Sequence, residues 1–334
     1  MRRQSKIMNP ILEVKDLHVN YKTYLGELKV LNGVNLTVHE GEKVGIIGES
    51  GCGKTTTMRA ILRILATNAI IKGGSINFRG KDILKMDKTT LTDIRRKHIT
   101  MIFQDPTAAL NPVFKVEEML SDVVRFSANF NSGKATKENI RERCLQVLKE
   151  VALPDPERVL DSYPFQLSGG MRQRICIAMS LATARDLLIA DEPTTNLDVT
   201  IQDQVLRLMK KLVEEKKISV ILISHALGTV RGTVDTVYVM YAGNMIETAE
   251  TNELFSNPLH PYTQGLLKSV PKLTGAGFSE GIRGRVPDYI NPPQGCRFHP
   301  RCEYAMDICK KEKPQFLGVN GNKHKVACWL YSKR

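Results

Sequence analysis

The feature that most constrains the fold is an apolar segment that runs directly into a glycine-rich loop and then into a helical pattern. Residues 44–47 are apolar without alternation, which is typical of a buried strand. The next eight residues, Gly-Glu-Ser-Gly-Cys-Gly-Lys-Thr at 48–55, fit the pattern G-x-x-x-x-G-K-[ST], and helical spacing continues through Leu62 and Leu65. Strand, loop and helix in this order predict a phosphate-binding loop at the start of a helix.

The residue types in this loop suit a nucleotide and its magnesium ion. Glycines allow backbone N–H groups to turn inward around the α- and β-phosphates, Lys54 is expected to reach the β- and γ-oxygens, and the Thr55 hydroxyl is expected to bind Mg²⁺. Cys52 is interpreted as a small side chain that fits the loop, with a redox-sensitive thiol as the alternative. The loop residues expected to contact the nucleotide are Gly48, Ser50, Gly51, Cys52, Gly53, Lys54, Thr55 and Thr56.

An acidic pair follows a second buried segment. Residues 187–190 are all apolar, which predicts a parallel strand that is buried on both faces. Asp191 then lies at the carboxyl end of this strand, where doubly wound sheets bind ligands, and is a candidate to hold Mg²⁺. Glu192 is a candidate to polarise the attacking water. The alternative is that the two acids only cap the next helix.

The octapeptide Leu-Ser-Gly-Gly-Met-Arg-Gln-Arg at 167–174 opens another helical pattern. Ser168, Gly169 and Gly170 leave the start of this helix uncovered by large side chains. Exposed N–H groups and the positive end of the helix dipole can then approach a phosphate. Taken alone, the same residues would be an ordinary cap and loop.

The order of these segments resembles that of the nucleotide-binding subunits of ABC transporters, over about residues 11–255. The resemblance implies that Gln104 contacts Mg²⁺ and water, that Asp198 belongs to the D-loop, and that His225 contacts the γ-phosphate. It also implies an aromatic residue stacked on adenine, for which Tyr21 is our choice and Tyr24 the alternative. In such proteins the octapeptide 167–174 faces the nucleotide of the opposite subunit, which implies dimerisation driven by ATP.

Two positions depart from the family pattern. In the family, an acidic residue usually follows the histidine that contacts the γ-phosphate, called the switch histidine. Here that histidine is His225, and the next residue is Ala226. The D-loop usually reads Ser-Ala-Leu-Asp, whereas residues 195–198 read Thr-Asn-Leu-Asp. Neither change removes an atom that is expected to touch ATP, so we expect a competent ATPase.

The remaining patterns predict an α/β fold with a P-loop NTPase core. Strands near 11–20 and 34–39 are expected to form an antiparallel edge, and alternating strands and helices predict the doubly wound core. A helical subdomain is expected at about 107–185, where apolar residues recur at helical spacing between Ile140 and Val151. We expect one nucleotide-binding domain at 1–255, a linker at 274–284 and a C-terminal extension at 256–334.

Four of the seven cysteines lie in that extension, with the spacing C-x5-C-x6-C-x18-C. Clustered cysteines in a cytosolic protein indicate metal ligands more often than disulfides, and the absence of C-x2-C pairs argues against zinc. Four thiolates on loops suit a [4Fe–4S] cluster, whose negative charge the nine Lys/Arg against three Asp/Glu at 294–334 would offset. Zn²⁺ and four small buried residues are the alternatives. The predicted ligands are Cys296, Cys302, Cys309 and Cys328.

The extension also narrows the resemblance. His-Pro-Tyr-Thr at 260–263 and Gly-Cys-Arg-Phe-His-Pro-Arg-Cys at 295–302 resemble the D-type ATPase subunits of dipeptide and oligopeptide importers, some of which bind a [4Fe–4S] cluster. This implies ATP hydrolysis coupled to peptide import at the cytoplasmic face of the membrane. The implied partners are a second ABC ATPase subunit (a paralogue or an identical copy), two transmembrane permease subunits and, indirectly, an extracytoplasmic peptide-binding protein. Import of nickel or another small solute is the alternative.

Composition limits the other function classes. No apolar run is long enough for a transmembrane helix, and the basic N-terminus lacks the apolar core of a signal peptide. The net charge of +13 would suit a soluble ATPase acting on nucleic acid. Such a protein should carry tandem nucleotide domains, a coiled coil or a basic arm with stacking aromatics, and the sequence contains none of these. We expect no nucleic-acid partner, and a structural rather than a regulatory cluster.

Overall fold

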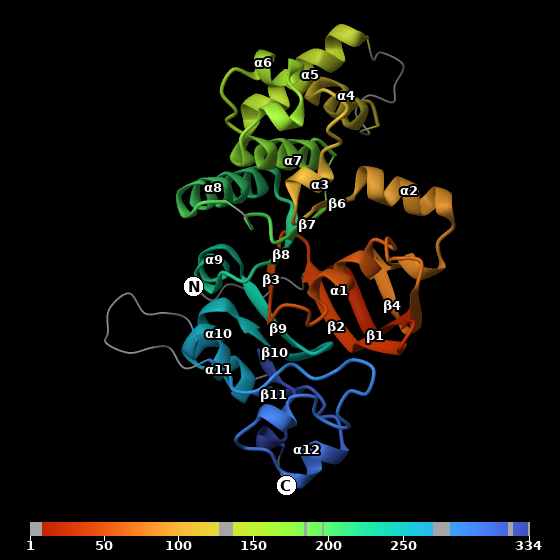
Figure 1. The fold of residues 1–334 in the computed structure, drawn as a ribbon, viewed down its shortest axis with the longest axis vertical. Coiled ribbons are helices and arrows are strands. Elements are labelled where there is room, and N and C mark those ends of the chain that lie inside the picture. Colours follow the sequence, from red (N-terminus) through yellow and green to blue (C-terminus); the bar gives the residue numbers. More distant parts are fainter. Residues whose placement is uncertain are drawn as a thin grey trace. The chain divides into compact units, whose positions relative to one another are not determined.

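The computed structural model divides the chain into two compact units, which are described separately (Figure 1). The first unit combines residues 1–85 with 223–334, and the second comprises residues 86–222. The expected boundary at 255 does not coincide with this division, because the C-terminal extension packs with the N-terminal strands. The structure describes residues 9–126, 136–183, 186–195, 197–269, 281–319 and 323–332. Asn196 of the expected D-loop and positions 274–280 of the expected linker lie outside these residues.

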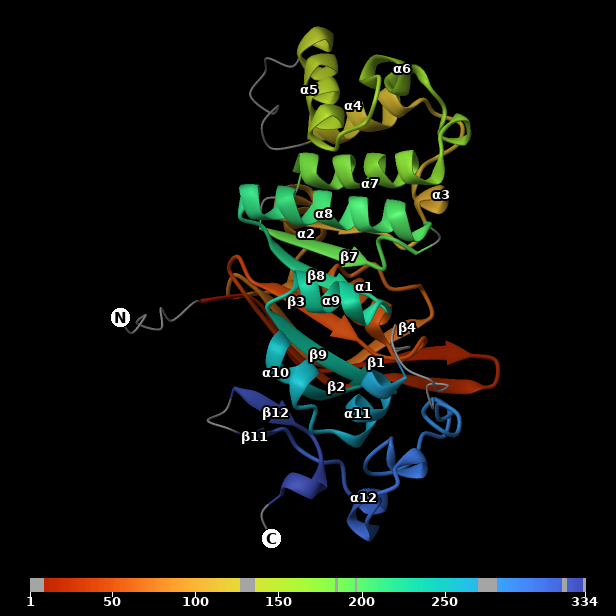
Figure 2. The ribbon, with the colours of Figure 1, turned by 90° about the vertical axis from the view of Figure 1, so that its left-hand side faces the viewer.

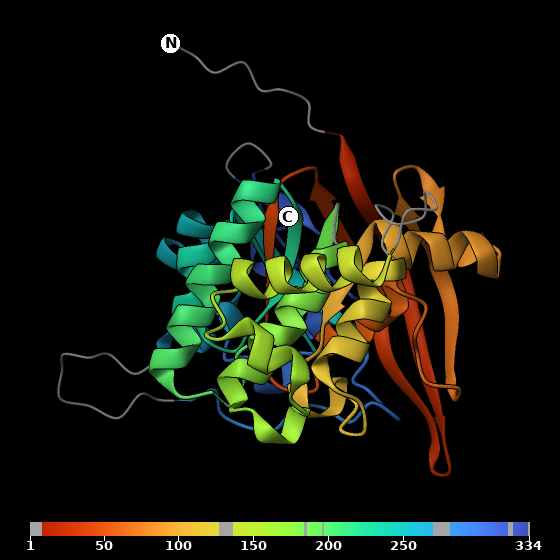
Figure 3. The same ribbon diagram turned by 90° about the horizontal axis from the view of Figure 1, so that it is seen from above.

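The first unit begins with an antiparallel sheet in the strand order β2-β1-β4-β5. Strands β1 and β2 form a long hairpin, coloured red in Figure 3, in which Thr23 pairs with Gly26. Buried residues alternate with more exposed ones in the middle of β1 and in the second half of β2, as expected for a sheet with one face against the core. The bounds are β1 Pro10–Thr23, β2 Gly26–His39, β4 Ala69–Phe78 and β5 Lys81–Asp82.

The rest of the first unit carries strands in the order β11-β12-β10-β9-β3. Strand β3 runs parallel to β9, whereas β9, β10, β12 and β11 pair antiparallel in turn. The last two strands of the chain therefore extend this sheet beyond β10. The bounds are β3 Lys43–Ile47, α1 Lys54–Ile61, α9 Leu227–Thr233, β9 Thr236–Tyr241, β10 Asn244–Glu250, α10 Thr251–Ser256, α11 Pro261–Lys268, α12 Asp307–Lys311, β11 Leu317–Val319 and β12 His324–Val326.

The second unit contains three neighbouring strands in the order β8-β7-β6 and most of the helices. Helices α7 and α8 lie side by side in this unit (Figure 2). All five residues of β7 and of β8 are buried, as predicted for parallel strands covered on both faces. The bounds are α2 Lys88–Lys97, β6 Ile99–Ile102, α3 Pro106–Ala109, α4 Val116–Phe126, α5 Lys137–Glu150, α6 Pro156–Asp161, α7 Gly169–Thr183, β7 Leu187–Asp191, α8 Val199–Lys216 and β8 Ser219–Ile223.

The predicted α/β P-loop core with an antiparallel sheet and a helical segment is confirmed. The apolar face expected between Ile140 and Val151 is buried, with Cys144 at its centre, so that cysteine is a core residue. Strand β2 begins earlier than expected, at Gly26 rather than near residue 34. Its first half is only partly buried, and Gly33 interrupts it with φ of 73°, which hides the alternation in the sequence.

A buried carboxylate ties the C-terminal extension to the sheet. Glu247 of β10 accepts hydrogen bonds from the backbone N–H groups of Leu259 (2.7 Å) and His260 (2.9 Å). It also accepts one from Nε2 of His324 in β12 (2.7 Å), and both side chains of this pair are almost fully buried. Three donors satisfy a carboxylate that would otherwise be costly to bury.

The pair of Glu247 and His324 should make stability depend on pH. Burial alone would lower the pKa of His324, but the hydrogen bonds and charges of Glu247 and Glu253 together outweigh this effect and raise that pKa. The stabilisation is therefore complete below the unfolded pKa of about 6.5 and is lost as pH rises through the higher folded value. Relative to His324→Gln, the wild-type protein should gain about 1–3 kcal/mol of unfolding free energy near pH 6, and this gain should shrink as the pH rises through the folded pKa of His324.

Chemical denaturation at several pH values measures this difference. His18→Gln is the matched control, because His18 pairs with Asp16 on the surface. A His324→Gln difference that stays constant over the whole pH range would contradict the assignment.

Candidate functional site

The predicted phosphate-binding loop lies between β3 and α1, as the sequence indicated. Gly48 has φ of 152°, and a Cβ atom there would lie 2.1 Å from the carbonyl oxygen of Met240, so only glycine fits. Gly53 directly precedes α1 with φ of 110°. The backbone N–H groups of the loop therefore lie at the N-terminal, positive end of α1, an arrangement that binds phosphates.

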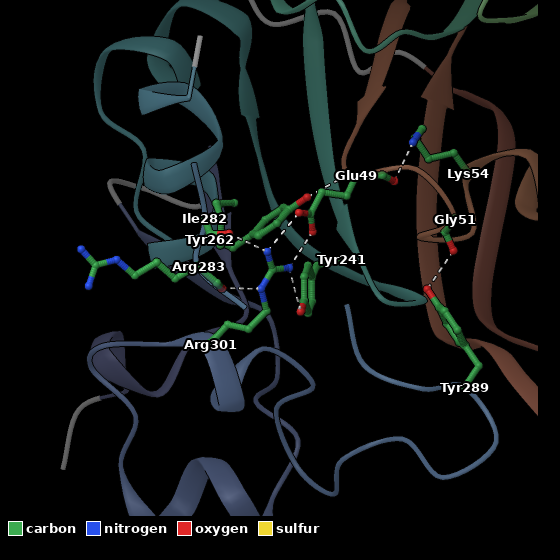
Figure 4. Close-up of polar contacts among 9 residues, drawn as sticks. All are labelled: Glu49, Gly51, Lys54, Tyr241, Tyr262, Ile282, Arg283, Tyr289 and Arg301. Carbon is green, nitrogen blue, oxygen red and sulfur yellow. Dashed lines mark hydrogen bonds and ion pairs between the residues drawn. The ribbon is translucent and has the colours of Figure 1, made fainter. Parts of the chain in front are cut away.

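Several side chains of this loop lie at the start of α1 or are buried within the loop. The Lys54 ammonium group is buried and donates to the carbonyl oxygens of Gly48 (2.8 Å) and Glu49 (3.0 Å), as Figure 4 shows for Glu49. Thr55 and Thr56 occupy the first turn of α1. Cys52 is buried, and burial raises the pKa of its thiol, which disfavours the alternative of a redox-sensitive thiolate.

In the second unit, Asp191 is the last residue of the buried strand β7, and Glu192 follows it directly. Asp191 is buried, and Glu192 is 8 % exposed. Nε2 of Gln104 donates to the Glu192 carboxylate at 2.8 Å, and the Thr195 hydroxyl donates to the same oxygen at 3.2 Å. Two of the predicted catalytic residues, Gln104 and Glu192, are therefore brought together.

Glu192 also has a backbone conformation that its side chain disfavours. Its φ is 48°, in the left-handed region that non-glycine residues rarely adopt. Such strain costs on the order of 1–2 kcal/mol and occurs preferentially at functional sites. No feature of the sequence indicated it, because Glu192 lies in an ordinary turn pattern before a proline.

The helix that the octapeptide 167–174 opens, α7, begins at Gly169, as predicted. The Ser168 hydroxyl accepts a hydrogen bond from the Met171 N–H at 3.3 Å and so caps α7. A Cβ atom on Gly170 would approach Ile201 of α8 to 2.9 Å, which explains the small residue there. Asp198 caps α8 by accepting from the Ile201 N–H at 3.0 Å.

The remaining predicted residues belong to the first unit. His225 follows β8 and is exposed, and Ala226 separates it from α9. Tyr21 lies near the end of β1 with a half-buried side chain, and Tyr24 is fully exposed in the turn of the hairpin. The choice between these two tyrosines as the adenine-stacking residue stays a prediction.

The four cysteines of the extension line one small cavity of about 10 Å³. Burial, reinforced by the other three cysteines, raises the pKa of Cys328 to about 11, and burial raises that of Cys296 to about 11. Two of the cysteines are joined through their backbones, since the Cys296 N–H donates to the carbonyl oxygen of Cys309 at 2.8 Å. The residue before Cys296 is Gly295, which has φ of 66°. Among the described residues, however, no group of three or more His, Cys, Asp or Glu is arranged to hold a metal ion.

Three residues of the C-terminal part contact the phosphate-binding loop, and sequence reasoning did not predict these contacts. They are Tyr262, Tyr289 and Arg301, whose contacts are shown in Figure 4. They lie more than 200 positions from the loop along the chain, so no local pattern or spacing could have connected them with it.

In the part of the chain that the structure describes, no helix is both long and apolar enough to cross a membrane.

Comparisons with known proteins agree with the geometry. The family described as "ABC transporter" matches residues 31–195, and the family described as "Oligopeptide/dipeptide transporter, C-terminal region" matches residues 246–309. Among solved structures, the dimeric post-hydrolysis state of the ATP-binding cassette MJ0796, bound to ADP and Pi, superposes with a TM-score of 0.63 at 28 % identity. That match covers 72 % of this chain and 98 % of that one.

Curated relatives match over nearly the whole chain. The oligopeptide transport ATP-binding protein OppD of Bacillus subtilis is 44 % identical over 96 % of this chain and 88 % of its own length. The dipeptide transport ATP-binding protein DppD of the same organism is 43 % identical over 98 % of this chain and 96 % of its own. The chain therefore belongs to the family of ATP-binding subunits of oligopeptide and dipeptide ABC transporters.

Proposed function

We propose that this chain is the ATP-hydrolysing subunit of an ABC importer for dipeptides or oligopeptides. One observation carries the proposal: an ABC core with its loop glycines, Lys54 and Glu192 in place is joined in a single chain to the oligopeptide/dipeptide transporter C-terminal region. Relatives that match nearly the whole chain carry names that specify oligopeptide or dipeptide transport. Import of nickel or another small solute is the competing possibility for the cargo.

Each residue in the site has a proposed role in hydrolysis. The loop N–H groups and Lys54 would bind the phosphates, and Thr55, Gln104 and Asp191 would hold Mg²⁺. Glu192 would take a proton from the attacking water as general base, and His225 would contact the γ-phosphate. The buried surroundings of Glu192 and its hydrogen bond to Gln104 support this assignment, because they fix the carboxylate in one orientation.

The proposed partners follow from the family. The chain would pair with a second ABC ATPase subunit, either a paralogue or an identical copy, at the cytoplasmic face of the membrane. Ser168 and Gly170 would serve the nucleotide that the opposite subunit holds. Closure of the two subunits on MgATP would then drive two permease subunits, which receive peptide from an extracytoplasmic binding protein.

We further propose that the four-cysteine cavity holds a [4Fe–4S] cluster bound by Cys296, Cys302, Cys309 and Cys328. The donor set supports this, because four thiols and no carboxylate line the cavity. At about 10 Å³ the cavity has room for about one water molecule, so the thiols would have to move apart to admit the cluster. They would also have to lose their protons, which makes binding dependent on pH. The bound cluster would cross-link segments of the extension and would take no part in ATP hydrolysis.

The decisive experiment concerns the cargo. Cells of the source organism that lack this chain should lose uptake of a labelled dipeptide or tripeptide. A wild-type copy should restore uptake, and a Lys54→Ala copy should not. Loss of nickel uptake with normal peptide uptake would contradict the peptide assignment.

Replacement of Lys54 by Ala should weaken MgATP binding on the order of 10²-fold, because the lysine contributes a charge-assisted contact to the phosphates. Titration with a fluorescent ATP analogue measures this affinity. Lys72→Ala, which removes an exposed lysine paired with Glu27, is the control and should bind as wild type does. Equal affinity of all three proteins would exclude Lys54 from the phosphate site.

A further inference from the structure

The phosphate-binding loop is held from the C-terminal part of the chain at three points. The Tyr262 hydroxyl accepts a hydrogen bond from the Glu49 N–H at 2.8 Å, and the Tyr289 hydroxyl donates to the Gly51 carbonyl oxygen at 2.8 Å. The Arg301 guanidinium donates to both carboxylate oxygens of Glu49, at 2.7 and 3.1 Å. Figure 4 shows all three side chains directed at the loop. Each contact engages the variable positions of the loop rather than its glycine and lysine framework.

Arg301 is the most firmly fixed of the three. Its side chain is 5 % exposed, and its remaining donors reach the carbonyl oxygens of Arg283 (2.9 Å) and Ile282 (3.1 Å) and the Tyr241 hydroxyl (3.3 Å). Burial alone would lower the pKa of Arg301, but its hydrogen bonds and charge interactions with Glu49 and Tyr241 together outweigh this effect and raise that pKa, so the group stays charged. A planar fork with several donors in fixed directions is specific to arginine.

Glu49 links Arg301 to Lys54, the side chain that is proposed to bind phosphate. The carboxylate of Glu49 is held by Arg301, its N–H by Tyr262, and its carbonyl oxygen accepts from the Lys54 ammonium group at 3.0 Å. Fixing Glu49 at its side chain and its N–H therefore fixes the peptide group beside Lys54. A loop that is already in its binding conformation loses less conformational entropy when the phosphates arrive.

We propose that Arg301 is a positioning residue for nucleotide binding, which acts through Glu49 and is assisted by Tyr262 and Tyr289. This proposal rests on the proposed function, since it assumes that the loop binds MgATP. Arg301 shapes the empty loop but does not touch the reacting atoms. Its loss should therefore raise the Kd and KM for MgATP and leave kcat nearly unchanged.

The position of Arg301 connects this role with the four-cysteine cavity. Arg301 lies in the turn between Cys296 and Cys302, two of the thiols that line the cavity. Phe298 in the same turn lines the cavity and packs edge-on against Tyr262, with ring centroids 5.5 Å apart. Tyr262 and Arg301, which hold the loop, directly follow or precede residues that line the cavity, namely Pro261 and Cys302.

The test compares Arg301→Gln, Arg301→Lys and the control Arg283→Gln. Arg283 is an exposed neighbour that contributes only its carbonyl oxygen, so its replacement removes the same charge and leaves the contacts intact. We expect Arg301→Gln to raise the Kd and KM for MgATP about tenfold, with kcat changed by less than about twofold. Arg301→Lys should recover part of the affinity, and Arg283→Gln should match wild type.

Thermal unfolding measured on the same proteins separates positioning from a merely structural role. The proposal would be overturned if the Arg301→Gln protein had a lower Tm but bound MgATP with the wild-type Kd. Equal Kd values for Arg301→Gln and Arg283→Gln would also overturn it. If Arg301→Gln does not fold, Tyr289→Phe removes a single hydroxyl and should raise Kd about threefold; an unchanged Kd there would also overturn it.

A double-mutant cycle provides the second measurement. Glu49→Gln combined with Arg301→Gln should bind MgATP no more weakly than the worse single variant, because both changes break the same contact. Fully multiplicative losses would contradict action through Glu49. A wild-type chain that neither binds nor hydrolyses MgATP would instead defeat the proposed function itself, so the two failures are distinguishable.

Discussion

Replacement of Glu192 by Gln is expected to slow ATP hydrolysis by about 10²–10⁴-fold while the Kd for MgATP changes by less than about threefold. The amide cannot accept a proton from the attacking water, but it has nearly the same shape as the carboxylate. Its oxygen can still accept the hydrogen bond from Gln104, so the surrounding geometry should survive. The loss should therefore appear in kcat and not in binding.

A second consequence of Glu192→Gln follows from the proposed dimer. Because ATP would persist unhydrolysed, the variant should accumulate as a dimer in the presence of MgATP, and light scattering measures this directly. Glu215→Gln is the matched control, since Glu215 is an exposed acid on α8 that pairs with Lys211. A kcat near the wild-type value in Glu192→Gln would exclude this residue as the base, whatever the oligomeric state.

Replacement of Cys302 by Ser is expected to remove iron and acid-labile sulfide from protein purified without oxygen, together with its visible absorbance. A hydroxyl is a far weaker ligand than a thiolate for an iron–sulfur cluster, so the loss should be nearly complete. MgATP should still bind, because every atom of the phosphate-binding loop remains. Metal analysis, absorbance and nucleotide titration on one preparation measure all three properties.

Cys144→Ser is the control for this substitution. Cys144 is buried in α5 with its sulfur 3.7 Å from the Ser121 hydroxyl, and it does not line the cavity. It should therefore keep the iron content of wild type. A colourless wild-type protein that carries one zinc ion per chain would contradict the cluster and favour the zinc alternative.

Local patterns predicted the elements that carry the nucleotide chemistry. The strand that ends at Ile47 and the helix that begins at Lys54 follow from an apolar run and a glycine-rich spacing within about twenty residues. The same holds for β7 before Glu192 and for the cap at Ser168. In each case the residues that decide the conformation are neighbours in the sequence.

Contacts between distant segments were beyond such reasoning. Glu49 occupies a position of the loop pattern where any residue is allowed, so nothing in the motif indicates that Arg301 holds it from 252 residues away. Likewise, Glu247 reads as one polar residue in a short strand, although it is a buried acceptor for His324. The positive φ of Glu192 depends on the surrounding structure and could not be predicted from the residue type.

The pairing of β12 with β10 has a consequence for how this family can be altered. Removal of residues 256–334 would leave the edge of β10 unpaired, and an exposed strand edge is a template for aggregation. It would also deprive Glu247 of all three of its donors and Glu49 of Arg301. The C-terminal region is thus not a detachable module. A chimaera that exchanges this region between two relatives would have to transfer the acceptors at 49 and 247 along with it.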